Sequence, residues 1–393
     1  MVVNVGKVNE VKEKYQLKHK DLAEFLAISE KQLWRMATGE QDIAEKHLES
    51  LKIIEQFYED EEPLQLLFDY VRIRFETTNV DYIIKNILLI NLDIIEAEEG
   101  GWYGYKKHYA FGDIVIMYDT LDIKKGVLIE LKGKGCRQFE QMLEAQGRSW
   151  YDFFYCAAKH EGIMRRIDLA VDDTVGILDI PYFIKKNEAD ECYTVFKKYD
   201  VYSASEIKQG EDKEKLMGKT LYIGSKRSDI YFCLYEKDYE RYLQTGVLPT
   251  FHQVKNRFEI RLKNDRAINM IKAYMRTNAL ENVAFDIINR YVSYKVAEIG
   301  VELKDCKMDV RWQMFLGIGR KKLKLTTKPE PVTLERTWKW INKQVAPTLK
   351  MLVSLDAIEG TNKLSEAIED AILQPQHEKQ IATQIYKAKD VIV

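Results

Sequence analysis

One segment of the chain combines the pattern of a buried strand with acidic residues that a buried strand does not need. The segment RRIDLAVDD, residues 165–173, alternates apolar and polar side chains, and alternating side chains along a strand point to opposite faces of a sheet. Its apolar positions are Ile167, Leu169 and Val171. The other face carries Arg166, Asp168 and Asp172, which places two carboxylates beside a guanidinium.

Two later segments show the same two-faced pattern. In IYFCLYEK the polar positions are Tyr231, Cys233, Tyr235 and Lys237. In RFEIRLK they are Arg257, Glu259, Arg261 and Lys263. One face exposed to solvent is common in antiparallel sheets and is the simplest interpretation. The convergence of carboxylates, arginines and a tyrosine favours a functional site instead.

The acidic side chains of these strands are suited to a metal ion. Asp168, Glu259 and Asp172 offer carboxylate oxygens, which are the ligands that hard divalent cations such as Mg²⁺ prefer. We expect Mg²⁺ or Mn²⁺ at this site. Such an ion would polarise a phosphodiester and orient it for in-line attack.

Tyr235 and Lys237 are suited to covalent attack on the same bond. A phenol titrates near ~10, so it is a weak nucleophile unless a cation stabilises the phenolate, and Lys237 lies on the same face. Attack would leave a 5′-phosphotyrosine and a free 3′-hydroxyl, and the strand could be resealed without a nucleotide cofactor. Arg166, Arg257 and Arg261 could bind the flanking phosphates.

Further strand patterns indicate the sheet that would position these residues. FDYVRIRFE, DIVIMYD, GVLIELKG and KTLYIGS also alternate with a period of two, and helical segments fall between them. We therefore predict an α+β fold, with a mainly antiparallel catalytic domain over residues 64–328 and helices on one face. Helical periodicity returns afterwards and predicts a helical C-terminal segment over residues 329–393.

The first sixty residues predict a separate all-helical domain. In HKDLAEFLAISEKQLWRMATG, a helix over residues 20–26 is followed by a turn, and Ser29 caps a second helix over residues 30–38 that Gly39 ends. This spacing is typical of a helix-turn-helix, whose second helix enters the major groove. Its expected DNA-binding side chains are Lys31, Gln32 and Arg35. A helical hairpin used only for packing is the alternative.

The composition limits the other possibilities. Of 393 residues, 46% are hydrophobic and 31% charged, and the net charge of −2 excludes a uniformly basic nucleic-acid binder, so a DNA surface must be local. One local basic run, Arg320, Lys321 and Lys322 in GIGRKKLK, is interpreted as a contact to the DNA backbone or as a solvated loop. The sequence lacks H-x-H and C-x-x-C pairs, a P-loop and any long apolar run, which predicts a cytoplasmic protein without a membrane span.

Several of these segments together resemble one known family. RxDLAxDD, YIGSxxSxxxxxLYEK and RFExRLK occur in the order found in the replication initiation factor family, over about residues 69–263. That family includes rolling-circle plasmid initiators and the related relaxases of Gram-positive conjugative elements. The added helix-turn-helix is similar to the MobT type of relaxase.

The resemblance implies a DNA strand transferase that nicks one strand at an origin through tyrosine, with a divalent metal. It implies Tyr235 as the nucleophile, with Tyr239 and Tyr231 as competitors, and Asp168, Glu259 and Asp172 as metal ligands in that order. Further DNA contacts are expected from Arg261 and Lys263.

Several functional alternatives remain open. An origin of transfer would require a coupling ATPase, an origin of replication would require a helicase and a polymerase, and either could involve an accessory DNA-binding protein. A metal-dependent nuclease that uses water, or a DNA-binding regulator without catalysis, is also compatible with the sequence. The sequence does not fix the oligomeric state.

Overall fold

The computed structural model describes residues 6–92, 95, 97–206, 215–246, 253–317 and 346–373. The chain divides into two compact units. The first comprises Met1–Phe139 and Trp150–Thr327, and the second comprises Glu140–Ser149 and Lys328–Val393. Each unit is described by itself.

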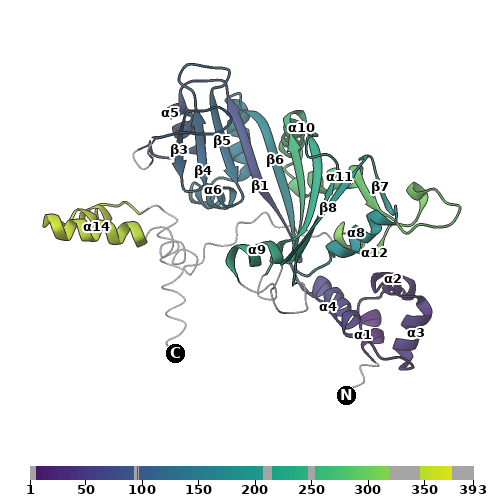
Figure 1. The fold of residues 1–393 in the computed structure, drawn as a ribbon. Coiled ribbons are helices and arrows are strands. Elements are labelled where there is room, and N and C mark those ends of the chain that lie inside the picture. Colours follow the sequence, from purple (N-terminus) through teal and green to yellow (C-terminus); the bar gives the residue numbers. More distant parts are fainter. Residues whose placement is uncertain are drawn as a thin grey trace. The chain divides into compact units, whose positions relative to one another are not determined.

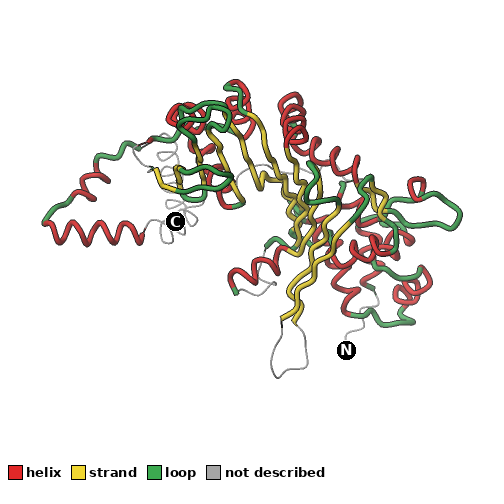
Figure 2. The backbone as a smooth tube through the Cα atoms, turned by 45° about the horizontal axis from the view of Figure 1, so that its top comes forward, coloured by secondary structure: helices red, strands yellow, loops and turns green. Residues whose placement is uncertain are grey.

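The first unit is built on one antiparallel sheet, which Figures 1 and 2 show from two directions. Among the described residues it has ten strands in the order β2-β3-β4-β5-β1-β6-β11-β10-β9-β8. Their bounds, in that order, are Ala97–Glu99, Lys107–Phe111, Ile114–Tyr118, Val127–Lys132, Leu64–Phe75, Ile163–Asp173, Asn256–Lys263, Ile230–Glu236, Lys215–Ile223 and Tyr199–Glu206. The strands expected to carry the site, β6, β11 and β10, are direct neighbours in the middle of the sheet. The predicted α+β class is therefore confirmed.

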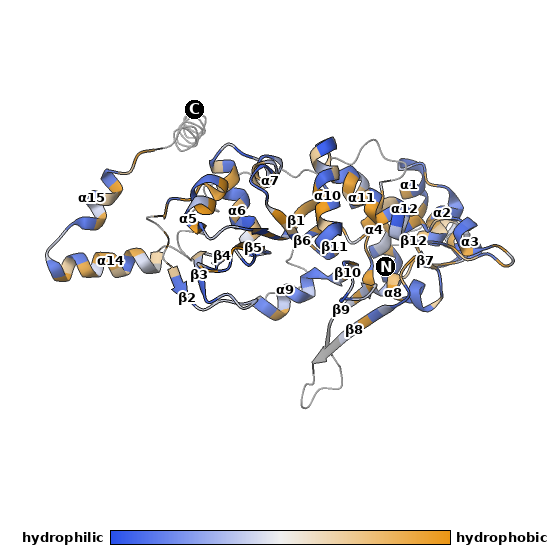
Figure 3. Cartoon of the chain, turned by 90° about the horizontal axis from the view of Figure 1, so that it is seen from above, coloured by the Kyte–Doolittle hydropathy of each residue, from blue (hydrophilic) through white to orange (hydrophobic). Residues whose placement is uncertain are grey.

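Helices cover one face of this sheet, as Figure 3 shows for α7, α10 and α11. Phe68 of β1 packs on Trp150 and Phe154 of α7, and Phe258 of β11 packs on Trp312 and Phe315 of α12. The helices between β5 and residue 317 are α6 (Lys134–Ala145), α7 (Trp150–Lys159), α8 (Ile180–Glu188), α9 (Lys237–Thr245), α10 (Asn264–Thr277), α11 (Leu280–Tyr291) and α12 (Val310–Phe315). The apolar core lies between the sheet and the layer that contains α7, α10, α11 and α12, which leaves the other face of the central strands for polar side chains.

Strand β1 changes its phase in the middle. Its buried apolar residues occupy even positions up to Phe68 and odd positions from Val71 onward. The register with β6 shifts between Phe68 and Tyr70, which is a β-bulge at Asp69. Asp69 and Tyr70 can therefore both direct their side chains to the open face, although they are consecutive in the chain.

The N-terminal helices agree with the helix-turn-helix pattern. They are α1 (Lys7–Lys14), α2 (His19–Phe25), α3 (Glu30–Thr38) and α4 (Glu45–Glu59). The Ser29 hydroxyl accepts a hydrogen bond from the backbone N–H of Gln32, and Gly39 ends α3 with φ of 80°. Lys31 and Arg35 are exposed, whereas Gln32, which was also expected on the exposed side of the helix, is half-buried.

These helices contact the segment that leads into α12. Lys307 forms ion pairs with Asp21 and Glu24 of α2, and Arg311 donates to the backbone carbonyl of Phe25. The Arg311 guanidinium also lies 3.9 Å from the centre of the Phe25 ring. The helical head and the sheet thus share one compact unit, and their expected separation near residues 60–63 stays a prediction.

The remaining elements are small. They are α5 (Val80–Ile83), a π-helix (Ile84–Leu88), a two-stranded sheet of β7 (Cys192–Thr194) and β12 (Val292–Tyr294), and a 3₁₀-helix (Leu303–Asp305). The second unit contains α14 (Ala346–Glu359) and α15 (Lys363–Glu369), which agree with the predicted helical C-terminal segment. In the described ranges, no helix has the length and apolar character needed to cross a membrane.

Candidate active site

Strand pairing brings the predicted site residues together on the open face of the sheet. Between β6 and β11, Asp172 lies opposite Arg257 and Asp168 lies opposite Arg261. Between β10 and β11, Tyr235 also lies opposite Arg257. Directly opposed side chains on one face have Cβ atoms about 5 Å apart, so this register by itself builds a contiguous charged surface.

Arg257 is the most completely held of these charges. Its guanidinium binds both carboxylate oxygens of Asp172, with 2.8 Å from Nη2 to Oδ2, and Nη1 lies 2.7 Å from Oδ1 of Asp69. Arg257 and Asp172 are both buried. Such burial is tolerated because the charges are paired and the fork of the guanidinium matches the carboxylate. Arg257 therefore ties β1, β6 and β11 together.

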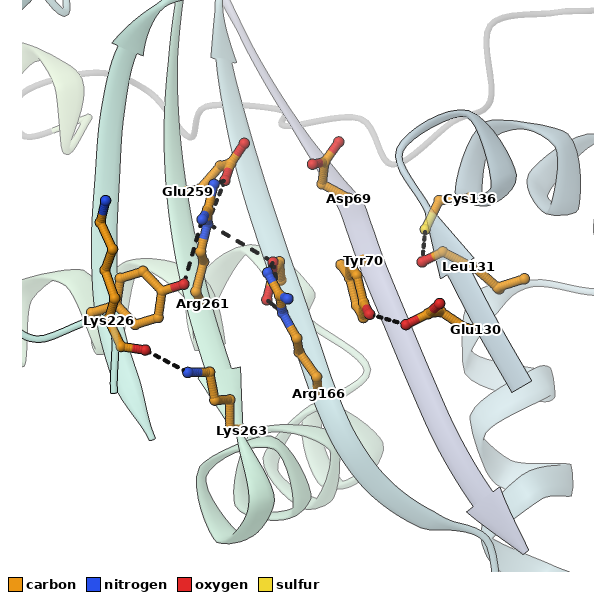
Figure 4. Close-up of polar contacts among 12 residues, drawn as sticks. Asp69, Tyr70, Glu130, Leu131, Cys136, Arg166, Lys226, Glu259, Arg261 and Lys263 are labelled. Carbon is orange, nitrogen blue, oxygen red and sulfur yellow. Dashed lines mark hydrogen bonds and ion pairs between the residues drawn. The ribbon is translucent and has the colours of Figure 1, made fainter. Parts of the chain in front are cut away.

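Two further arginines hold the other carboxylates. Arg166 binds Asp168 with both Nε and Nη2, the latter at 2.6 Å from Oδ2. Arg261 binds Glu259, with 2.7 Å from Nε to Oε2, and its Nε lies 3.9 Å from Oδ2 of Asp168. The side chains of Arg166 and Arg261 are more accessible than that of Arg257. Figure 4 shows Glu259 and Arg261 along β11, with Arg166 on the neighbouring strand β6.

Tyr235 lies between a carboxylate and an ammonium group. Its hydroxyl donates to Oε1 of Glu259 at 2.8 Å, and it accepts from Nζ of Lys237, which lies 3.3 Å from the Tyr235 hydroxyl oxygen. Burial, reinforced by the charge of Glu259, raises the pKa of Tyr235 above its ordinary value. The phenol is thus neutral as described, with a proton acceptor and a cation already in contact with it.

Lys237 occupies a different element from the one expected. It begins helix α9 directly after β10 ends at Glu236, so it is not a strand residue. Its Nζ nevertheless reaches Tyr235 and also binds Glu240 in the first turn of α9. The predicted proximity of Lys237 and Tyr235 is therefore present, although a helix start provides it.

The competing tyrosines have different surroundings. Tyr231 is buried, and its hydroxyl accepts from Nη1 of Arg261 at 3.4 Å. Tyr239 lies in the first turn of α9 and is half-buried. The hydroxyl of Tyr235 contacts both the carboxylate of Glu259 and the ammonium group of Lys237.

The predicted DNA contacts are dispersed. Lys263 lies at the end of β11, and its Nζ donates to the backbone carbonyl of Lys226 at 2.7 Å. Lys31, Gln32 and Arg35 belong to the helical head. The basic run Arg320, Lys321 and Lys322 lies outside the described residues.

The three carboxylates do not form a metal centre in this arrangement. Asp168 and Asp172 are four residues apart on one strand, which separates their Cα atoms by roughly 13 Å, too far for two aspartates to share one ion. Arginine occupies the oxygens of Asp168, Asp172 and Glu259. Over the ranges that the structure describes, no cluster of three or more histidine, cysteine or acidic side chains is placed to hold a metal ion.

The structure adds residues that were not expected in the site. Asp69 reaches Arg257 through the bulge in β1, and the phase change in the FDYVRIRF alternation could have indicated it. Tyr70 lies under Arg166, with 4.0 Å from the guanidinium carbon to the ring centre, and its hydroxyl donates to Glu130 of β5. Figure 4 shows this continuation of the polar face toward β5. Glu130 has no comparable sequence signal.

Asp168 provides a test through the pH dependence of stability. Burial raises its pKa to about 6, against the opposing effect of Arg166 and Arg261. Asp168 therefore binds a proton more tightly in the folded chain than in the unfolded chain, where its pKa has the ordinary value near 3.8. Its contribution to stability is fully present below about pH 4 and is lost as the pH rises through about 6.

We expect the free energy of unfolding of the wild type to fall relative to that of Asp168→Asn as the pH rises from about 4 through about 6. Urea unfolding of both proteins between pH 4 and pH 8 measures it. A difference that stays constant, or that moves in favour of the wild type with rising pH, would show that the pKa of the Asp168 carboxyl is not raised by folding.

Comparisons with known proteins agree with the fold and the strand motifs. Residues 162–368, more than half of the chain, match the family described as replication initiation factor. Residues 65–156 match the N-terminal domain of rolling-circle replication initiation proteins.

Two relatives extend this agreement. NicK of Bacillus subtilis (strain 168), whose name describes it as a DNA relaxase, is 36% identical over 334 residues, covering 85% of this chain and 93% of NicK. The solved rolling-circle replication initiator protein of Geobacillus stearothermophilus is similar with a TM-score of 0.56 and 28% identity, covering 65% of this chain and 96% of that one. The resemblance seen in the strand motifs is thereby confirmed, and the chain belongs to the replication initiation factor family of rolling-circle initiators and DNA relaxases.

Proposed function

We propose that this protein nicks and rejoins one DNA strand at an origin of transfer through a covalent 5′-phosphotyrosine on Tyr235. The observation that carries the proposal is the position of the Tyr235 hydroxyl, which contacts both Glu259 and Lys237 on the polar face of the sheet. The family membership supports DNA as the substrate and nicking as the reaction.

The contacts of Tyr235 suggest how its hydroxyl becomes a nucleophile. Glu259 accepts the phenolic hydrogen bond and is placed to take the proton, while the Lys237 ammonium would stabilise the phenolate. The phenolate oxygen forms a bond to phosphorus as the bond from phosphorus to the 3′-oxygen breaks. The leaving 3′-oxygen takes up a proton, and attack by that 3′-hydroxyl later restores the DNA.

The arginines divide into two roles in this proposal. Arg166 and Arg261 are partly accessible, and each can exchange part of its carboxylate pairing for a DNA phosphate. Arg257 is buried in its contacts with Asp172 and Asp69. We therefore assign Arg257 to positioning the strands, not to binding phosphate as its residue type alone suggested.

The same chemistry would serve an initiator of rolling-circle replication. NicK favours the transfer role by its name, and the solved relative favours the replication role by its title. Transfer would require a coupling ATPase, and replication would require a helicase. The proposal of strand transfer through tyrosine is the same in both cases.

The tyrosine is tested by covalent capture on DNA. Tyr235→Phe removes the nucleophile but keeps the ring, so it should abolish the protein–DNA adduct on supercoiled DNA that carries the origin. Tyr231→Phe and Tyr239→Phe are the matched controls and should retain the adduct. Denaturing gels detect the adduct, and peptide mapping locates it.

The outcome separates the competing functions. An adduct that persists in Tyr235→Phe and maps to Tyr231 or Tyr239 would contradict the choice of nucleophile. Nicking without any adduct would favour a nuclease that uses water, and origin binding without nicking would favour a regulator.

The need for a divalent cation is a separate prediction that rests on the family resemblance. Arginines hold the carboxylates of Asp168, Asp172 and Glu259, so the attack by Tyr235 is proposed without a role for a metal ion. We expect EDTA to abolish nicking and added Mg²⁺ or Mn²⁺ to restore it, as measured on supercoiled origin DNA. Undiminished nicking in EDTA would leave Lys237 and the arginines as the cations that oppose the phosphate charge.

We propose that helix α3 of the helical head binds the origin while the origin is double-stranded. Arg35→Ala should weaken binding to duplex origin DNA roughly 5- to 150-fold, or about 1–3 kcal/mol. Covalent capture of a single-stranded oligonucleotide with the nick site should be unaffected. Lys52→Ala, which removes an exposed cation of α4, is the control. Equal affinity of Arg35→Ala and wild type for duplex DNA, measured by anisotropy, would contradict this role.

A further inference from the structure

Two exposed aromatic side chains lie on the loop between β2 and β3. Trp102 is 39% exposed and Tyr103 is 53% exposed. Large aromatic side chains usually bury most of their surface, and exposed rings next to each other are a common feature of interaction sites. These two residues are not used by the proposed reaction.

A buried carboxylate fixes the positions of both rings. Glu130 of β5 is buried, and it accepts hydrogen bonds from Nε1 of Trp102 at 2.6 Å and from the Tyr103 hydroxyl at 2.9 Å. Tyr70 donates to the same carboxylate, and Nζ of Lys132 lies 2.9 Å from it. The rings are therefore held by their polar ends while much of their apolar surface stays accessible.

The loop backbone is shaped to hold this arrangement. Tyr103 has φ of 58°, a left-handed conformation that is costly for a residue with a side chain and that often marks a functional position. A Cβ on Gly101 would lie 2.9 Å from the backbone oxygen of Tyr105. Tyr105, which belongs to the same loop, is buried in a small apolar cluster with Met117 and Leu128. This cluster anchors the end of the loop that carries the two rings.

Cations lie beside both rings. The Arg72 guanidinium is 4.8 Å from the centre of the Tyr103 ring, and Nζ of Lys132 is 4.8 Å from the centre of the Trp102 ring. Aromatic rings beside cations are the combination that binds unpaired nucleotides, because bases stack on the rings and phosphates pair with the cations.

The rings belong to the same face of the sheet as the candidate active site. Glu130 lies opposite Arg72 of β1, and Tyr70 lies opposite Asp168 of β6. Strand β10, which carries Tyr235, is four strands from β5 in the sheet order, which is roughly 19 Å across the strands. Tyr235 is level with Asp172 of β6 and Glu130 is level with Arg166, so the two places are also separated by six residues, or roughly 20 Å, along the strands. A single DNA strand that crosses this face could contact both places.

We propose that Trp102 and Tyr103, with Arg72 and Lys132, form a stacking site for unpaired bases of the DNA strand that is cut. This inference deepens the proposed function and rests on it for the identity of the strand. The site would take single-stranded DNA without strong preference for base sequence, since every base presents an aromatic face.

Binding of the full-length chain to a fluorescent single-stranded dT12 oligonucleotide tests this site, with dT12·dA12 duplex as the comparison. Trp102→Ala and Tyr103→Ala should each weaken dT12 binding roughly 5- to 150-fold, the equivalent of about 1–3 kcal/mol per stacked base. Duplex binding should change less than about twofold. Tyr155→Ala is the matched control because Tyr155 is a 56% exposed tyrosine on α7. Affinities equal to the control, or equal losses on both DNA forms, would overturn the proposal.

A second variant separates stacking from loop structure. Trp102→Phe keeps an aromatic ring but removes the hydrogen bond to Glu130, whereas Trp102→Leu keeps neither. Stacking predicts that Trp102→Phe retains most of the dT12 affinity that Trp102→Leu loses, with equal thermal unfolding of the two variants. Equal loss of affinity in both would overturn stacking in favour of a structural role for the tryptophan.

All binding measurements are repeated in Tyr235→Phe, so that they do not depend on strand cleavage. If no variant or wild type forms an adduct but Trp102→Ala still loses dT12 binding selectively, the proposed nicking fails and the stacking site stands. If the adduct forms on Tyr235 but dT12 binding is insensitive to both rings, the stacking site fails and the nicking proposal stands.

Discussion

The pairing of β6 with β11 is the constraint on which the site depends. Their register places Asp172 opposite Arg257 and Asp168 opposite Arg261. If one strand slipped by one residue, its charged side chains would point into the apolar core, because side chains alternate between the two faces with a period of two. The apolar face, where Phe258 packs on Trp312, opposes such a slip. The hydrophobic layer thus sets the geometry of the charged face that it does not touch.

The charged face is itself buried to an unusual degree. Asp168 is only 2% exposed, and Asp172, Glu259 and Arg257 are similarly covered. Charges at such positions need partners, since an unpaired one would cost several kcal/mol. The arginines supply these partners for Asp168, Asp172 and Glu259. Binding of DNA must then compete with existing ion pairs, which is easiest at the more accessible Arg166 and Arg261.

Strand faces could be predicted from the sequence because alternation is a local property. RRIDLAVDD and RFEIRLK each show their core side without reference to the rest of the chain, and the aromatic packing on one face and the ion pairs on the other agree. The bulge at Asp69 was also readable, as a change of phase within one strand. Other features depend on partners distant in the chain. Glu130 meets Tyr70, sixty residues away, and the capture of Asp172 by Arg257 joins residues that are 85 positions apart. Residue types alone do not reveal which carboxylates arginines hold, and the assignment of Asp168, Glu259 and Asp172 as metal ligands stays a prediction.

The bulge in β1 joins the two halves of the polar face. In a regular strand, Asp69 and Tyr70 would point to opposite sides, and one of them would enter the helical layer. The bulge allows Asp69 to bind Arg257 while Tyr70 lies beneath Arg166 and reaches Glu130. The charges around Tyr235 are thereby connected through β1 to the carboxylate that holds Trp102 and Tyr103. A regular β1 would leave a gap in the polar face between Tyr235 and the exposed rings, so the extra residue in this strand is what makes the polar face continuous.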